Sequence, residues 1–127
     1  MRRALDGLAG AIAIDAAAYP EFVRDVIDSG RIQKFEYCVE LFWKQLRSSL
    51  IAEGLDVPTS PKAAIKAGLD RGVVSESEYQ PALDMIADRN TWSHVYRQSM
   101  LPTTLSRLPA YHSLMQAVAD RLSAADR

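Results

Sequence analysis

The clearest regular pattern of hydrophobic positions runs from Ile32 to Leu50. Apolar side chains recur there every three or four residues, as along the buried face of an α-helix. They are Ile32, Phe35, Val39, Phe42, Trp43, Leu46 and Leu50. On the polar face, Glu40 and Lys44 stand four residues apart in the order that favours a salt bridge. The pattern predicts a long amphipathic helix that begins after Gly30 and ends before Gly54.

Weaker patterns predict helical segments ahead of this one. Residues Arg3–Ala18 are rich in alanine and leucine and predict a first helix. Tyr19 and Pro20 interrupt it, because proline disfavours the helical conformation in the residue before it. Glu21–Asp28 is then predicted to form a second, short helix.

Capping residues mark where two later helices begin. Ser60 is a suitable N-cap, and Pro61 follows it at the first helical position. This helix is expected to end by Gly72. Ser75 and Glu78 have the spacing of a capping box, which predicts the start of the next helix.

The last two helices each have an expected buried stripe. For the first, the stripe is Tyr79, Ala82, Leu83 and Ile86, and for the second it is Leu101, Leu105, Leu108, Met115, Val118 and Leu122. His112 falls on the second stripe and is expected to be partly buried and hydrogen-bonded. Pro109 predicts a kink or break there.

Together these segments predict one all-α domain over residues 1–127. Period-two alternation, which would indicate strands, is absent. The expected fold is an up-and-down antiparallel four-helix bundle with short extra helices.

Composition narrows the possible functions. With 127 residues and a formal charge of -1, the chain has no broad basic surface for duplex nucleic acid, although a small local basic site is compatible. Cys38 is the single cysteine, so it cannot form an internal disulfide and is expected to be a small buried filler in a reducing compartment. With two histidines besides it, no metal or other cofactor is expected. No apolar run reaches the roughly 20 residues of a membrane span, so we expect a cytoplasmic protein.

The stretch Asp88–Tyr96, DRNTWSHVY, contains the strongest candidates for chemistry. Histidine is the side chain suited to general acid–base catalysis near neutral pH, so His94 could take a proton from an RNA 2′-hydroxyl. Arg89 stays charged and can hold a phosphate through two hydrogen bonds. Such a pair needs no metal.

Helix geometry does not bring this pair together. Residues five apart diverge by about 140° and about 7.5 Å of rise, so Arg89 and His94 do not meet on one helix. A break at Asn90, acting as an N-cap, or a second copy of the chain would be needed. The alternative is an ordinary helix start in which Asn90 caps and Trp92 packs, and spacing alone favours it.

The polar face of the long helix offers a second set of candidates. Glu36, Glu40 and Lys44 could contact a partner or a nucleotide. The more common interpretation, which we favour, is a solvated helix face opposite a core of aromatic side chains.

Three blocks of sequence, in this order, carry a family resemblance. They are GRIQKFEYCVELFWKQLRSSL (residues 30–50), SPKAAIKAG (60–68) and LDMIADRNTWSHVY (83–96). Together they resemble the nucleotidyltransferase substrate-binding protein family, which is similar to the HEPN superfamily of helical domains.

The resemblance implies a homodimeric helical bundle that forms a complex with a minimal nucleotidyltransferase, in some cases as a toxin–antitoxin pair. It further implies a metal-independent ribonuclease, with Arg89 holding phosphate, His94 as general base or acid and Asn90 positioning. Tyr96 would be the acceptor of an adenylyl group from the partner.

Two other interpretations remain open. In one, the chain is a non-catalytic subunit that binds substrate or nucleotide for the nucleotidyltransferase. In the other, it is a plain interaction bundle whose partner is its own second copy.

Overall fold

Five α-helices and one short 3-10 helix make up the part of the chain that the computed structural model describes, which is residues 1–94 and 101–125, with the backbone alone for residues 92–94. They are α1 (Arg2–Ala13), η1 (Ala16–Ala18), α2 (Glu21–Ala52), α3 (Pro61–Asp70), α4 (Glu76–His94) and α5 (Leu101–Ala125). These residues contain no strand, so the predicted all-α fold is confirmed.

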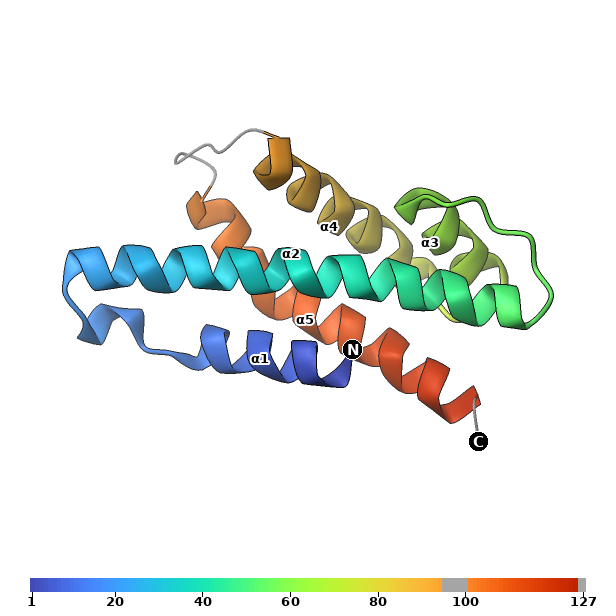
Figure 1. The fold of residues 1–127 in the computed structure, drawn as a ribbon, viewed down its shortest axis with the longest axis horizontal. Helices are drawn as coiled ribbons and strands as arrows, with labels where there is room; N and C mark the ends of the chain where they lie inside the picture. Colours follow the sequence, from blue (N-terminus) through green and yellow to red (C-terminus); the bar gives the residue numbers. More distant parts are fainter. Residues whose placement is uncertain (95–100, 126–127) are drawn as a thin grey trace.

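Helix α2 is the centre of the bundle, because it contacts each of the other four α-helices. Figure 1 shows α1 running back along one side of α2, α3 and α4 on the other side, and α5 crossing behind. The long helices α1, α2, α4 and α5 reverse direction in turn, as predicted, and α3 is a short addition. Every buried stripe therefore meets α2 or a helix packed on it.

Gly30 lies inside α2, so the predicted separation of Glu21–Asp28 from the long helix is wrong. A glycine in a helix costs only about 1 kcal/mol relative to alanine, which packing readily overrides. Arg31 anchors this stretch, since its Nε donates to the carbonyl of Ala11 at 2.8 Å and its Nη2 to that of Ile14 at 2.6 Å. These bonds satisfy carbonyls at the end of α1 and hold the two helices together.

Helix α1 is shorter than the predicted Arg3–Ala18. Its buried residues are Leu5, Leu8 and Ala11, whereas η1 buries none. Without packing, a local preference for helix is too weak to extend α1 beyond Ala13.

The helix boundaries that depend on capping residues are confirmed. Ser60 Oγ accepts a hydrogen bond from the Ala63 amide at 3.1 Å. Ser75 and Glu78 form the reciprocal capping box, with distances of 2.9 and 3.2 Å. Gly54 follows α2 with a φ of 97°, a left-handed conformation that glycine adopts without strain.

The predicted core of α2 is confirmed, since Phe35 and Phe42 are fully buried and Trp43 is 8% exposed. Cys38 is also fully buried, and burial raises the pKa of its thiol to about 11. It is thus an unreactive filler at neutral pH, as expected. His112 is half-buried with its Nε2 3.0 Å from the Leu5 carbonyl, which confirms a hydrogen-bonded histidine.

The predicted stripes missed three hydrophobic core residues, Met85 in α4 and Tyr111 and Leu114 in α5. Helix α5 also continues through Pro109, so the helix does not break there. Pro109 is exposed, and the loss of one backbone hydrogen bond is most easily tolerated on the side that water reaches. In the described part of the chain, no helix is both long enough and apolar enough to cross a membrane.

Candidate functional site

Helix α4 runs without interruption from Glu76 to His94. A break at Asn90, one of the two arrangements that could bring Arg89 and His94 together, is therefore absent, and Asn90 is an exposed residue within the helix rather than its cap. Just beyond it, the Thr91 hydroxyl donates to the Ala87 carbonyl at 3.0 Å, a bond within the same helix. Backbone hydrogen bonding along α4 already satisfies this stretch, so the chain has no need of a new N-cap here.

The continuous helix separates the two residues of the expected catalytic pair. Arg89 and His94 leave α4 about 140° apart and about 7.5 Å apart in rise. His94 is the last residue of α4, and only its backbone is described. Tyr96 lies outside the described residues. The backbone positions of the two residues thus lie on different faces of α4.

Arg89 is held in place by an ion pair between helices. Its Nη2 lies 2.6 Å from Oε1 of Glu40 on α2, and the two side chains are 24% and 30% exposed. A part-exposed pair of this kind fixes the position of a guanidinium more than it stabilises the fold. The structure therefore brings together two residues that sequence analysis named separately.

Glu40 also contacts Lys44 one turn along α2. Its Oε2 lies 3.3 Å from the Lys44 ammonium, which confirms the predicted pair. The same ammonium lies 5.8 Å from the ring centroid of Trp43. Glu36 is half-buried one turn before Glu40 on the same helix face. The candidate residues of α2 and α4 thus form one charged seam, consisting of Glu36, Glu40, Lys44 and Arg89.

Some hydrogen-bond donors of the seam and of the adjacent Trp43 have no partner among the described residues. The salt bridge to Glu40 uses one nitrogen of Arg89, and a guanidinium has five N–H donors. Arg89 Nε and Trp43 Nε1 are buried and have no hydrogen-bond partner among the described residues. Because Nε is buried, an outside phosphate could be reached only by the terminal nitrogens of Arg89, one of which is already paired with Glu40.

A buried acid, Asp88, holds the backbone that carries Arg89. Asp88 is only 9% exposed. Its Oδ2 accepts a hydrogen bond from the Tyr111 hydroxyl at 2.6 Å, and Arg107 donates to both of its carboxylate oxygens at 3.0 and 3.1 Å. The ring of Tyr111 stacks on Phe35 with centroids 5.7 Å apart. This network ties α4 to α5 and to the core.

Sequence analysis missed the Asp88 network, although a signal was present. Asp88 follows the buried positions Ala82 and Met85 at intervals of three, so it falls on an apolar face. A carboxylate on such a face requires buried partners. Tyr111 was not on the predicted stripe of α5, so the partner could not be named.

In chemical terms, the seam offers a fixed cation at the surface between α2 and α4. It can bind an anion such as a phosphate. General acid–base catalysis would need a proton acceptor from outside the seam. His94, whose backbone ends the same helix, is the nearest histidine in sequence.

Comparisons with known proteins bear on the family and the fold of the chain. A family model described as nucleotidyltransferase substrate binding protein like matches residues 1–124. A crystal structure of a protein from Thermus thermophilus is similar to this chain, with a TM-score of 0.83 and 34% sequence identity over 95% of this chain and 97% of that one. A search of curated proteins found no match.

Proposed function

Because the chain belongs to the nucleotidyltransferase substrate binding protein like family, we propose that it is the helical partner subunit of a minimal nucleotidyltransferase. The family match covers nearly the whole chain, so it includes the seam as well as the bundle. The sequence of the neighbouring gene is a direct test of whether this partner exists. A short protein with a Gly-Ser-x-x-x-Gly nucleotidyltransferase motif is expected there, and it should co-purify with this chain.

For the chain's own activity, we propose metal-independent cleavage of RNA, as the toxin half of a toxin–antitoxin-like pair of the HEPN type. The observation that carries this proposal is the placement of Arg89. Its guanidinium is fixed by Glu40, partly open to water, and five residues before His94 on a continuous helix. A fixed cation at the point where charge develops is the main requirement for phosphoryl transfer.

The proposed reaction needs two residues in defined roles. His94 takes the proton of an RNA 2′-hydroxyl, and the 2′-oxygen forms a bond to the adjacent phosphorus. The bond from phosphorus to the 5′-oxygen breaks, and that oxygen takes a proton from protonated His94 to leave as a 5′-hydroxyl. The other product is a 2′,3′-cyclic phosphate. Arg89 donates to the non-bridging oxygens while their negative charge grows.

The working cleft is proposed to lie across the two-fold axis of a homodimer. The positions of Arg89 and His94 lie about 140° apart around one α4, whereas two copies related by a two-fold axis can bring the arginine of one near the histidine of the other. Asn90, exposed on the same helix, would position the RNA. Tyr96 would be the adenylylation site, at which its oxygen attacks the α-phosphorus of ATP and releases pyrophosphate.

Cleavage of RNA in EDTA is the direct test. Purified protein is expected to cut RNA without added metal, and His94→Ala is expected to abolish the cut. Circular dichroism of the variant should remain that of a folded helical protein. Full activity in His94→Ala would refute the catalytic assignment.

The second candidate function is a non-catalytic subunit that binds substrate or nucleotide for its partner. The 2.6 Å pair with Glu40 favours it, because a cation that is already neutralised is a weaker catalyst. Failure of the wild-type protein to cut any RNA, together with tight co-purification with the nucleotidyltransferase, would select this function.

A further inference from the structure

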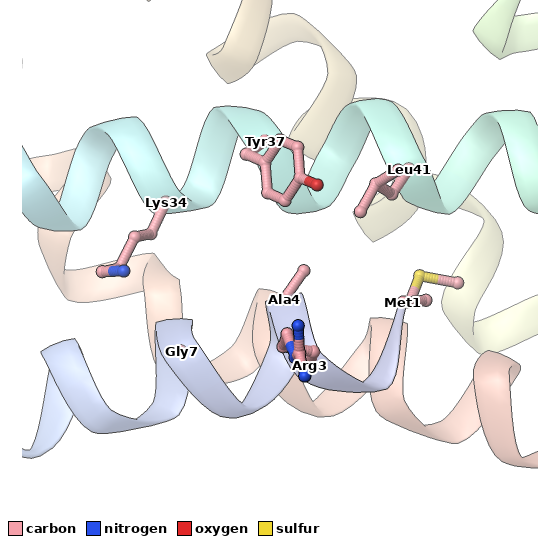
Figure 2. Close-up of a pocket in the computed structure, with 7 residues that line it drawn as sticks. All are labelled: Met1, Arg3, Ala4, Gly7, Lys34, Tyr37 and Leu41. Carbon is pink, nitrogen blue, oxygen red and sulfur yellow. The ribbon is translucent and has the colours of Figure 1, made fainter.

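A groove between the start of α1 and the middle of α2 lies apart from the charged seam. It has a volume of about 270 Å³, and Figure 2 shows the side chains that line it. Its walls combine two basic residues, one aromatic residue and a small or apolar floor. These are Arg3 and Lys34, then Tyr37, then Ala4, Gly7 and Leu41.

The two basic residues are not neutralised within the described part of the chain. Neither Arg3 nor Lys34 forms a salt bridge to a described carboxylate, whereas Lys44, Lys66 and Arg71 each do. None of the residues that line the groove is acidic. Unneutralised basic side chains in a concave surface attract anions, and phosphate is the commonest anion of the cell that binds in this way.

Lys34 lies close to Gly7 at one end of the groove. A Cβ at position 7 would lie 3.6 Å from the Lys34 ammonium, which is an ordinary contact distance. Figure 2 shows Lys34 reaching from α2 toward Gly7 on α1. Burial raises the pKa of the Cys38 thiol to about 11, and the positive charge of Lys34 opposes that rise. The positive charge of the Lys34 ammonium is therefore felt at the buried Cys38 thiol as well as at the surface.

Tyr37 gives the groove a flat apolar surface. Its side chain is 61% exposed, although it lies in the middle of the central helix. Figure 2 places Tyr37 between Lys34 and Leu41 along α2, above the floor of the groove. An exposed aromatic ring beside basic side chains is the combination that binds a nucleobase by stacking and its phosphate by charge.

We propose that this groove binds a nucleoside monophosphate, with Lys34 and Arg3 on the phosphate and Tyr37 stacked on the base. The volume is close to the lower end of small-molecule sites, roughly 300 Å³, so the groove fits one nucleotide rather than two. The site differs from the proposed catalytic residues, because Tyr37 and Lys34 face α1 whereas Glu40 faces Arg89 on α4. The same chemical unit occurs as a free nucleotide and at the 5′-phosphorylated end of an RNA.

Calorimetric titration of the full chain tests this proposal. The probes are AMP, inorganic phosphate, adenosine, and a four-nucleotide RNA with and without a 5′-phosphate. AMP is expected to bind more tightly than phosphate or adenosine. Preference for the phosphorylated RNA over AMP would assign the site to RNA ends, and the reverse would assign it to free nucleotide. No binding of any probe at millimolar concentration would overturn the proposal.

Single substitutions locate the site. Tyr37→Ala and Lys34→Ala are each expected to weaken AMP binding about tenfold. Phe22→Ala is the matched control for the aromatic residue, since Phe22 is 73% exposed on the same helix but far from the groove. Lys62→Ala, on α3, is the control for the lysine. Equal AMP affinity in all four variants and the wild type would overturn the proposal.

A glycine pair in α1 separates loss of the groove from loss of the fold. Gly7→Leu is expected to fill the groove beside Lys34, whereas even the Cβ of a residue at position 10 would meet nothing within 4 Å. Gly10→Leu is therefore the matched control. Both changes raise helix propensity, so both variants should be at least as stable as the wild type. AMP binding is expected to fall at least tenfold in Gly7→Leu alone; unchanged binding there would refute the site.

The same titrations distinguish this proposal from the ribonuclease proposal. His94→Ala leaves the groove intact, so AMP should bind this variant as it binds the wild type. Loss of AMP binding in His94→Ala would place the nucleotide at the proposed catalytic residues and overturn the separate site. Because binding is read without cleavage, each proposal can fail without the other.

Discussion

Asp88 and Arg89 are neighbours in α4, yet they belong to ion pairs of different kinds. Asp88 is 9% exposed and is held by Tyr111 and Arg107 of α5. The Arg89 side chain is 24% exposed and is paired with Glu40 of α2. Adjacent residues on a helix point about 100° apart, so one faces the interior and the other the surface seam.

The comparison separates what holds the bundle together from what can meet a ligand. A carboxylate in the interior must keep its partners, because an unpaired buried polar group costs more than an exposed one. A part-exposed cation can exchange or share its partner at little expense in stability. Asp88 therefore holds α4 in place, and Arg89 is the residue that α4 presents to a ligand at the surface.

The largest expected effect concerns Arg89 and appears in activity rather than stability. Arg89→Ala is expected to lower RNA cleavage by about 100-fold, as when one donor to a developing oxyanion is lost. Arg89→Lys should recover little, because lysine lacks the two-pronged geometry. Urea unfolding should change by less than about 1 kcal/mol. Wild-type cleavage by the alanine variant would remove Arg89 from the mechanism.

Substitution of Asp88 should affect stability more directly than activity. Asp88→Ala leaves the Tyr111 hydroxyl buried without its acceptor and is expected to lower the free energy of unfolding by about 2 kcal/mol. Asp84→Ala is the matched control, since Asp84 lies one turn earlier, is exposed and accepts a bond from Gln80. The control should lose less than about 0.5 kcal/mol. Equal losses in urea melts of the two variants would contradict a buried anchor at Asp88.

Tyr111 gives the same network a pH dependence. Burial, followed by the bond to Asp88, raises the pKa of Tyr111 above its usual value near 10. The unfolded chain thus loses this proton at lower pH than the folded chain. The contribution to stability is fully present below about pH 10 and declines as pH rises through the folded pKa.

Substitution of Tyr111 by phenylalanine isolates that contribution. Tyr111→Phe is expected to lower the free energy of unfolding by about 1 kcal/mol at neutral pH. The gap between the variant and the wild type should narrow above about pH 10 in urea melts at fixed ionic strength. A gap that stays constant through alkaline pH would mean that the hydroxyl does not titrate as the structure indicates.

The smallest expected effect belongs to Glu40. Glu40→Gln removes the negative charge beside Arg89, so RNA should bind a few-fold more tightly, with unfolding changed by less than about 1 kcal/mol. Glu53→Gln is the control, because Glu53 follows α2 and pairs with Arg71, away from the seam. Identical salt-dependent RNA affinity for both variants would show that Glu40 does not modulate Arg89.

Features with local causes could be predicted from the sequence. Ser60 caps α3, and Ser75 with Glu78 caps α4, because the donors and acceptors lie within three residues of one another. The pair of Glu40 with Lys44 is local in the same sense. For such features the spacing along the chain already fixes the geometry in space.

Features that depend on packing between helices could not be predicted. Gly30 continues α2 instead of preceding it, because Arg31 and the contact with α1 outweigh the weak propensity of glycine. Glu40 was identified as a candidate, but its pairing with Arg89 depends on how α2 meets α4. A break at Asn90 would have relied on a capping preference that the continuous α4 does not use.

The central claim is that Arg89 of one copy works with His94 of another, and mixing two inactive variants tests it most directly. Arg89→Ala and His94→Ala, unfolded together and refolded as a mixture, should form hybrid dimers with one intact composite site. Roughly a quarter of wild-type RNA cleavage is then expected, since half of the dimers are hybrids and each has one of two sites. If the separate variants are inactive, the wild type is active and the hybrid dimers form without cutting RNA, the shared cleft is contradicted.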